Sequence, residues 1–568
     1  MLLPTPAIDA RSEAGPKVPA IARVLPSLTD LAFLMPVIFL FAKLDGARTL
    51  LGDGDTGWHV RTGEWILAHG AVPHTDFFSF SRPGAPWFAW EWLWDVAFAL
   101  LHQRWGMSAV VAASMAVICL TSALLFRLVR RACGNGLVAI AVTLLATGGC
   151  AIHWLARPHL FTLLFFTVTL HITMRASEGR TKLLYWLVPL TLLWTNLHGG
   201  FFVVFLVLAC YIAAAFAGAC VASDPAVRKA SVASAKPWLI VFALCFAVTF
   251  VNPYGWQLHR HVVEYITDPY QLQHITEFQS MNFHSPVTVY FEPLMILTIA
   301  VAIWDLKNRR FAEAFLTLGW LHLALIAQRN LPIYALAASP AVARGIMTAI
   351  RHAGGSSDAL ASWIGSLAAW FQRFSASFEE TDRIARVHLA GLLPVAAVSA
   401  LLILTPPAKG VLDSKLTSTY DPAAYPEKAI PLLLTAETRH IFAEDEWGDY
   451  LIYNLYPSKK VFVDGRSDFY GDDFGNKYLD LMNVQPGWQK TLDKYAIDTI
   501  VIAPRFALAT TLKISRDWKV VYDDHVALIF RRNVPEQTSL VTSNEGNNRD
   551  RAIAKTTTIG RKAAQPKT

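Results

Sequence analysis

Long apolar runs recur along most of the chain, and they constrain the fold more than any other feature of the sequence. Each run has roughly 15 to 22 residues, about the length that a helix needs to cross a bilayer core. Only 16% of all residues are charged, against about 25% in ordinary soluble domains. We therefore predict a polytopic α-helical membrane protein with about eleven transmembrane helices. The runs begin near Ser27, Met107, Leu137, His159, Leu183, Phe201, Pro237, Pro293, Phe311, Leu331 and Leu389.

Lys and Arg residues cluster in every second connection between these runs, for example at residues 127–131, 175–182 and 307–310. Because cytoplasmic loops carry the excess of positive charge, these loops and the N-terminal tail, residues 1–26, are predicted to be cytoplasmic. An odd number of spans then places the C-terminal region outside. We expect a multi-pass protein of the inner (plasma) membrane, surrounded by the lipid bilayer. These clusters account for the net charge of +7, so no nucleic acid partner is expected.

The apolar runs define a transmembrane domain at residues 27–406, and two of its outer connections, residues 45–106 and 254–292, are long. The first of these ends in a tryptophan-rich segment, which suits a helix lying at the level of the lipid headgroups. Glu91 and Asp95 within this segment are four residues apart. They therefore share one helical face, which we expect to be solvated.

The composition changes after the last apolar run. Residues 407–533 are typical of a small α/β domain, here extracytoplasmic, and residues 534–568 have too little apolar content to fold, so we expect a disordered tail. The pattern predicts strands at residues 439–443, 460–464, 498–503 and 518–530, separated by helical stretches that include residues 450–455 and 476–482.

Two aspartates, Asp53 and Asp55, lie among glycines in the first outer connection, in the segment D-G-D-T-G-W-H. Glycines bend the backbone and leave the carboxylates uncrowded. Such a pair can bind a divalent cation through its oxygens, or one carboxylate can act as a general base. The alternative is a turn in which an Asp caps a helix that begins near Trp58.

The remaining outer connections carry His, Arg and Asn residues at the ends of the apolar runs. Arg binds phosphate in a bidentate manner and His hydrogen-bonds to phosphate oxygens, so these residues suit a phosphate site. The alternatives are cationic side chains that reach to the interface and, for Glu277, a solvated loop acid. The candidate substrate-binding residues are His59, Arg61, His153, Arg157, His159, His198, Glu277 and Arg329.

Two further motifs, D-E-W-G-D-Y at residues 445–450 and V-D-G-R-S-D at residues 463–468, put acids beside Trp or Arg at predicted strand ends. Aromatic and acidic edges suit the binding of a sugar or a peptide. Turns that need Gly and Asp in a small α/β fold are the equal alternative.

Together these features resemble the GT-C superfamily of membrane glycosyltransferases, which use polyprenyl-phosphate-linked sugars, and distantly the catalytic subunit of oligosaccharyltransferase. There, an acidic motif in the first outer loop is followed by a His, an Arg and a helix, and D-G-D-T-G-W-H-V-R-T-G-E-W-I-L-A-H-G at residues 53–70 looks similar. The segment I-T-E-F-Q at residues 275–279 resembles the family's Glu motif. E-W-G-D-Y at residues 446–450 resembles its W-W-D-Y-G motif in rearranged order. The likeness covers most of the chain in topology, and only the first loop is specific at the residue level.

The family's second acidic motif has no counterpart, because the loop H-W-L-A-R-P-H at residues 153–159 carries no carboxylate. The resemblance therefore implies one of two sites. Either a divalent cation, Mg or Mn, is held by Asp53, Asp55 and Glu277, or Arg residues hold the phosphate without a metal, as in other GT-C members. The rearranged W-G-D-Y order does not predict binding of an N-glycosylation sequon.

The resemblance implies an inverting glycosyltransferase that moves a sugar from a polyprenyl-phosphate-linked donor to a hydroxyl of a glycan, lipid or protein acceptor. Asp53 or Asp55 would take the proton from that hydroxyl. Two alternatives stay open: a ligase or transferase of a whole lipid-linked glycan, and a non-catalytic lipid or polysaccharide transporter. The enzyme hypothesis requires Asp53 or Asp55 to line one outward cavity, open to lipid, together with Arg157, Arg329 and Glu277.

Overall fold

The computed structural model describes residues 23–354, 362–385, 387–404 and 414–533. The predicted disordered tail, residues 534–568, lies outside the described residues. So do most of the predicted N-terminal tail and the predicted domain boundary at residue 406.

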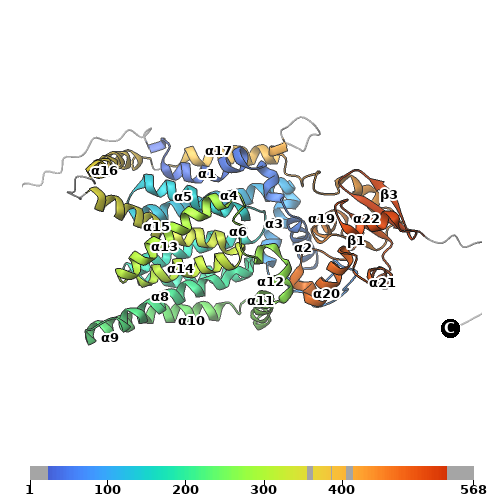
Figure 1. The fold of residues 1–568 in the computed structure, drawn as a ribbon, viewed down its shortest axis with the longest axis horizontal. Coiled ribbons are helices and arrows are strands. Elements are labelled where there is room, and N and C mark those ends of the chain that lie inside the picture. Colours follow the sequence, from blue (N-terminus) through green and yellow to red (C-terminus); the bar gives the residue numbers. More distant parts are fainter. Residues whose placement is uncertain (1–22, 355–361, 386, 405–413, 534–568) are drawn as a thin grey trace, which may run out of the picture. The chain divides into compact units, whose positions relative to one another are not determined.

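Helices form most of the chain (Figure 1). Among the described residues, seven helical segments are long and apolar enough to cross a membrane, so the chain is a mostly helical multi-pass membrane protein. The helices that precede the C-terminal region are α1 (Leu28–Lys43), α2 (Asp55–His69), α3 (Trp92–Trp105), α4 (Met107–Cys133), α5 (Gly136–Cys150), α6 (His159–Ser177), α7 (Leu187–Leu197), α8 (Val203–Cys220), α9 (Pro225–Ser234), α10 (Lys236–Val248), α11 (Trp256–Thr267), α12 (Pro269–His274), α13 (Thr288–Lys307), α14 (Phe311–Ile326), α15 (Leu331–Gly354), α16 (Ser362–Asp382) and α17 (Leu389–Leu404).

Every predicted apolar run forms a helix, but four of these helices are not among the seven long segments. They are α1, α14 and α17, with 16 residues each, and α7, with 11 residues. The run that ends in α7 begins within a tighter 3₁₀ helix, Thr181–Trp186, so α7 itself starts only at Leu187. The count of eleven spans therefore stays a prediction beyond the seven long segments.

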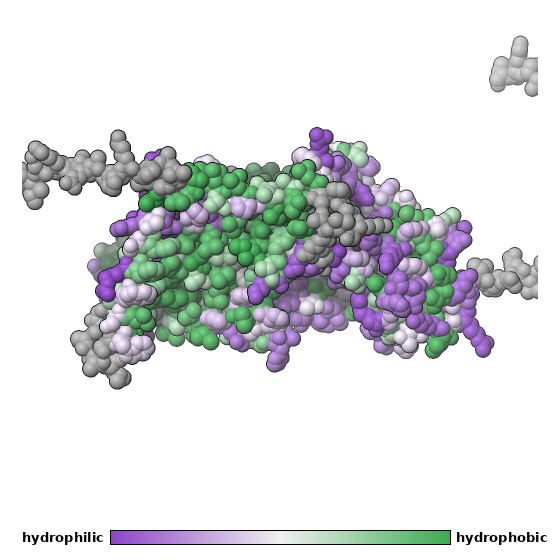
Figure 2. All heavy atoms as spheres, turned by 90° about the horizontal axis from the view of Figure 1, so that it is seen from above, coloured by the Kyte–Doolittle hydropathy of each residue, from purple (hydrophilic) through white to green (hydrophobic). Residues whose placement is uncertain are grey.

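Apolar side chains cover the helical part of the molecule, and hydrophilic side chains gather over the C-terminal region (Figure 2). Ile38 of α1 and Leu392 and Leu393 of α17 are among the exposed apolar side chains. Inside, hydroxyls such as those of Thr143 and Thr167 donate to the backbone carbonyl one helical turn earlier, which satisfies them without water. Both features suit a lipid environment.

The basic clusters pair with acids near one end of the helices. Arg130 at the end of α4 donates to Glu379 and Asp382 of α16, and Arg344 of α15 donates to Asp305 of α13. The C-terminal elements lie at the opposite end of the helices from α9 and α16 (Figure 1).

The C-terminal region is a small mixed sheet with helices. Its elements are α18 (Ile430–Leu433), β1 (Ile441–Ala443), α19 (Asp445–Leu455), α20 (Ser467–Met482), α21 (Trp488–Lys494), β2 (Thr499–Ile502), α22 (Ala507–Ile514), β3 (Trp518–Asp523) and β4 (Leu528–Arg532). The strand order is β1-β2-β4-β3, with β1 parallel to β2 and the other pairs antiparallel.

The predicted strand at residues 518–530 is a hairpin, because Asp524 accepts the backbone amides of Val526 and Ala527 and turns the chain. The predicted strand at residues 460–464 is wrong as a full strand. Only Val461 forms bridges there, and one of them joins it to Ser79 of the first outer connection. That connection thus completes the C-terminal region.

Glu444, at the end of β1, makes the stability of this region depend on pH. Burial raises the pKa of its carboxyl to about 7, although the exposed Arg505 beside it acts in the opposite direction. A folded-state pKa above the unfolded value means that stability is full below about pH 4.5 and is lost as the pH rises through 7. Between pH 4.5 and pH 7.5, we expect the unfolding free energy to fall by about 3 kcal/mol less in Glu444→Gln than in the parent protein. Identical pH slopes for the variant and the parent would contradict this.

Candidate functional site

A cavity of about 530 Å³ lies where the C-terminal region meets the ends of the helices. Its lining comes from the first outer connection, from the loop between α5 and α6, from α6, α8, α11, α14 and α15, from the loops that precede α8 and α15, from the loop around Glu277 and from residues 465–468. It brings together the predicted residues Asp55, His59, His153, Arg157, His159, His198, Glu277 and Arg329.

The Asp pair is held by one guanidinium. Nη1 of Arg157 lies 2.9 Å from Oδ2 of Asp53, and its Nη2 lies 2.5 Å from Oδ2 of Asp55. Helix α2 begins at Asp55 with Gly54 as N-cap and no side-chain cap, so the capping interpretation of the pair is wrong. Asp55 therefore lies on the helix, where it lines the cavity, whereas Asp53 lies in the preceding turn and does not. Burial raises the pKa of Asp53 to about 7, against the effect of Arg157.

The two C-terminal motifs meet at this Asp pair. Asp449 of α19 accepts the amide of Gly465 at 2.8 Å and is 1% exposed. A Cβ at position 465 would lie 2.4 Å from Oδ2 of Asp449 and 2.6 Å from Oδ1 of Asp55, so only glycine fits there. Burial and the neighbouring Asp55 raise the pKa of Asp449 well above its ordinary value. The motifs thus contact Asp55, and residues 465–468 of the second motif line the same cavity.

Arg329 is the second guanidinium in the cavity. It lies 3.6 Å from Glu277, donates to the Tyr265 hydroxyl at 3.1 Å, and stacks on the Phe278 ring at 4.3 Å. Burial alone would raise the pKa of Glu277, but Arg329, His153 and Arg157 lower it to about 2. Glu277 is therefore an ionised partner of Arg329 and not a solvated loop acid.

The histidines of the cavity are fixed by backbone and side-chain contacts. Nδ1 of His198 accepts the amide of Gly200 at 3.0 Å and lies 2.7 Å from the Thr162 hydroxyl, which leaves Nε2 as its N–H donor. Burial lowers the pKa of His198 to about 3, so the ring is neutral at physiological pH. Nε2 of His159 lies 2.6 Å from the carbonyl oxygen of His153.

The prediction that Glu91 and Asp95 form a solvated face is wrong. Glu91 is 7% exposed and lines the cavity, and Asp95 is fully buried, with Oδ1 2.7 Å from Nδ1 of His59. The sequence spacing could have indicated this burial. Asp95 lies three residues before Phe98 and four before Ala99, which places it on the apolar face of α3.

Other lining residues were missed because they carry no catalytic signature, among them Trp58, Trp87, Trp90 and Tyr265. Arg61, a predicted substrate-binding residue, does not line the cavity. It donates to the backbone carbonyl of Tyr453 and to Glu64, and so joins α2 to α19. Trp94 is 1% exposed inside the protein and does not lie at the headgroups.

The predicted cation ligands do not fit a metal ion as they are placed. Among the described residues, no three His, Cys, Asp or Glu side chains converge as a metal-binding group. Asp53 and Asp55 instead pair with Arg157, and Glu277 pairs with Arg329.

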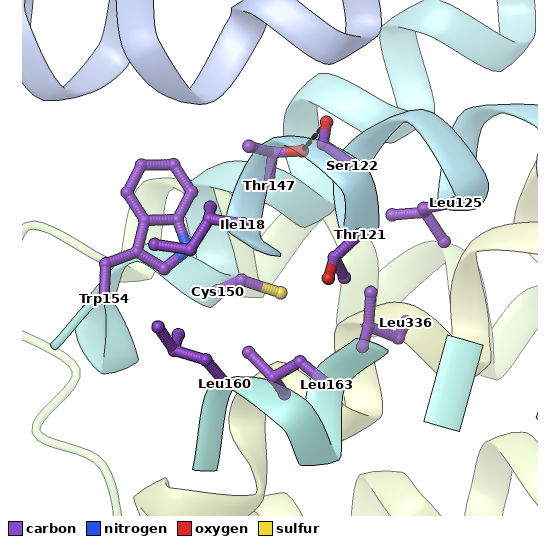
Figure 3. A pocket seen from close by; sticks show the side chains of 10 residues that line it. All are labelled: Ile118, Thr121, Ser122, Leu125, Thr147, Cys150, Trp154, Leu160, Leu163 and Leu336. Carbon is purple, nitrogen blue, oxygen red and sulfur yellow. Dashed lines mark hydrogen bonds between the residues drawn. The ribbon is translucent and has the colours of Figure 1, made fainter. Parts of the chain in front are cut away.

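A second cavity, of about 20 Å³, lies among α4, α5, α6 and α15 (Figure 3). Its lining is mostly apolar, and the thiol of Cys150 and the hydroxyl of Thr121 point into it. A space of this size holds about one water molecule and no substrate.

No known family model matches the sequence, and no curated protein is significantly similar to it. Solved structures do match. The oligosaccharyltransferase of Archaeoglobus fulgidus, tethered to an acceptor peptide with an NVT sequon, has a TM-score of 0.52 and 9% identity over 84% of this chain and 68% of its own. The same organism's oligosaccharyltransferase AglB, in complex with an inhibitory peptide and a dolichol-phosphate, has a TM-score of 0.51 and 11% identity over 84% of this chain and 69% of its own. The chain thus has the fold of an archaeal oligosaccharyltransferase.

Proposed function

We propose that the protein is an inverting GT-C glycosyltransferase that moves a sugar from a polyprenyl-phosphate-linked donor to an acceptor hydroxyl at the outer face of the inner membrane. The acceptor is a glycan, a lipid or a protein. The observation that carries the proposal is that Asp55, Arg157 and Arg329 line one cavity of about 530 Å³. These three residues come from separate parts of the chain and converge there, which a set of unrelated interfacial charges would not do.

The cavity offers separate surroundings for the two ends of a lipid phosphate. Arg157, Arg329 and the Nε2–H of His198 are donors for phosphate oxygens. Phe202 and Leu206 also line the cavity and are 37% and 39% exposed, so the cavity reaches the apolar surface of α8. A prenyl chain would leave by this side.

Asp55 is the better base candidate of the pair, because it lines the cavity and Asp53 does not. As the acceptor oxygen attacks the anomeric carbon, its proton passes to the Asp55 carboxylate. The bond between the anomeric carbon and the phosphate oxygen breaks, and its electron pair leaves with the phosphate. Arg157 and Arg329 stabilise that charge, and Asp53 holds Arg157 in place.

We expect Arg329→Met to weaken binding of undecaprenyl phosphate by about 10- to 100-fold, because a charge-assisted contact to phosphate is lost. Native mass spectrometry in detergent micelles measures the dissociation constant. The double variant Glu277→Gln with Arg329→Met leaves no unpaired buried carboxylate and should show the same loss. Arg260→Met, which removes a 75% exposed guanidinium on α11, is the matched control. Unchanged affinity in the two Arg329 variants would contradict the phosphate site.

A further inference from the structure

The first outer connection forms one wall of the cavity. This wall differs from the wall that carries Arg157 and Arg329, which we call the cationic wall. Its members from residues 55–91 are aromatic, acidic or imidazole side chains, and none is Lys or Arg. Trp58 and Trp87 make an edge-to-face pair with 6.1 Å between ring centroids, and Trp90 packs over Gly199. An indole surface with a few polar side chains suits a ligand with apolar C–H faces and a rim of hydroxyls.

His59 is the best-fixed polar group on this wall. Asp95 holds Nδ1 at 2.7 Å, the Trp58 ring stacks on the imidazole at a centroid distance of 3.7 Å, and Trp94 meets it edge-on at 5.2 Å. His59 lines the cavity, and its Nε2 edge has no partner among the described residues. The ring therefore offers one positioned nitrogen to a ligand.

The backbone of α2 and α3 is shaped for this contact. A Cβ on Gly63 would lie 1.9 Å from the carbonyl oxygen of Asp95, so the two helices approach this closely only because residue 63 is glycine. Gly63 lies one helical turn beyond His59 and shares its face. The close approach is what brings the Asp95 carboxylate to the imidazole.

The position of His59 suits binding of the sugar part of the donor. Asp55 and His59 lie four residues apart on α2, so they share a face and are separated by about 6 Å along the axis, comparable to the width of a sugar ring. If Asp55 serves the anomeric carbon, the next groups along the helix meet the rest of that sugar. Glu91 lines the same wall, with Oε1 3.9 Å from Nε2 of His198.

We propose that His59, Trp58 and Glu91 form the subsite for the transferred sugar, a neutral pyranose, with Asp95 as the positioning residue for His59. This inference rests on the proposed function. The indole packs on the C–H face of the sugar, His59 hydrogen-bonds to a ring hydroxyl, and Glu91 accepts or donates a hydrogen bond at a second hydroxyl. The phosphate stays at the cationic wall.

The test compares lipids that differ only in the sugar. The probes are undecaprenyl phosphate and undecaprenyl phosphate that carries glucose, galactose or mannose, and the dissociation constants are measured by native mass spectrometry of the intact protein. We expect at least one sugar-bearing lipid to bind about tenfold or more tightly than the sugar-free lipid. Equal affinity for all four lipids overturns the sugar subsite.

Variants then show which residues cause the higher affinity for the sugar-bearing lipid. His59→Phe and, less severely, Asp95→Asn should lose about 5- to 10-fold in affinity for the sugar-bearing lipid, with affinity for undecaprenyl phosphate unchanged. The sugar-free lipid reports folding in the same sample, because a general structural defect weakens both. His69→Phe is the control, since His69 is exposed at the end of the same helix. Parallel losses for both lipids in Asp95→Asn as well as in His59→Phe overturn the inference.

Different results would contradict the proposed function. If undecaprenyl phosphate does not bind at all, or binds independently of Arg329, the cavity is not a lipid-phosphate site. If undecaprenyl phosphate binds through Arg329 and the sugar adds nothing, the function stands and only the sugar subsite falls.

Discussion

Asp55→Asn should reduce sugar transfer by about 10²- to 10⁴-fold, the contribution that a positioned general base makes. Asn keeps the size of the side chain and its place at the start of α2, but it cannot accept the proton of the attacking hydroxyl. Binding of undecaprenyl phosphate should persist, because Arg329 and His198 are unchanged. Transfer of radiolabelled sugar from a lipid extract in membranes, with equal amounts of protein, measures the effect.

Asp45→Asn is the matched control for this experiment, because Asp45 is an exposed acid of the same connection that does not line the cavity. It should keep full activity. A transporter would behave differently, since it needs no base and would move its lipid with Asn at position 55. Full activity in Asp55→Asn would therefore remove the assigned role and favour that alternative.

Arg466→Met should lower the free energy of unfolding by about 3–5 kcal/mol, because it leaves buried carboxylates without their partner. Arg466 is 2% exposed. It lies 2.7 Å from Asp464 and 2.8 Å from Asp76, and its guanidinium stacks on Trp87 at 4.5 Å. The side chain therefore joins the first outer connection to the C-terminal region, directly beside the cavity.

The apparent melting temperature in detergent measures this effect. The control, Arg260→Met, removes an exposed pair with Glu264 and should cost less than about 1 kcal/mol. Equal melting temperatures for Arg466→Met and the control would show that the Arg466 network does not hold the two regions together.

The sequence predicted the positions of the apolar helices, because burial in lipid demands long apolar runs and little else. It also selected most of the charged residues of the cavity, since an Arg, His or Asp at the end of an apolar run has few structural reasons to be there. The sequence did not predict which of these charged residues form ion pairs with each other. Asp53 and Arg157 are 104 residues apart, and nothing local in either segment indicates the other.

Most of the remaining differences between prediction and structure concern the direction in which a side chain points from its helix. Whether Asp53 or Asp55 faces the cavity depends on the residue at which α2 begins, and such boundaries shift by one or two residues in any sequence-based prediction. Asp95 looked solvated because it is charged, yet Gly63 allows α3 to pack against α2 with that carboxylate inside. The strand at residues 460–464 failed because the backbone of Val461 pairs with a loop almost 400 residues earlier in the chain.

A structure of the protein with undecaprenyl phosphate in lipid nanodiscs tests the central claim most directly. The account predicts the phosphate within hydrogen-bonding distance of Arg157 and Arg329, with the prenyl chain leaving past Phe202 and Leu206 of the apolar side. A phosphate bound outside this cavity, or bound without either guanidinium, would contradict it.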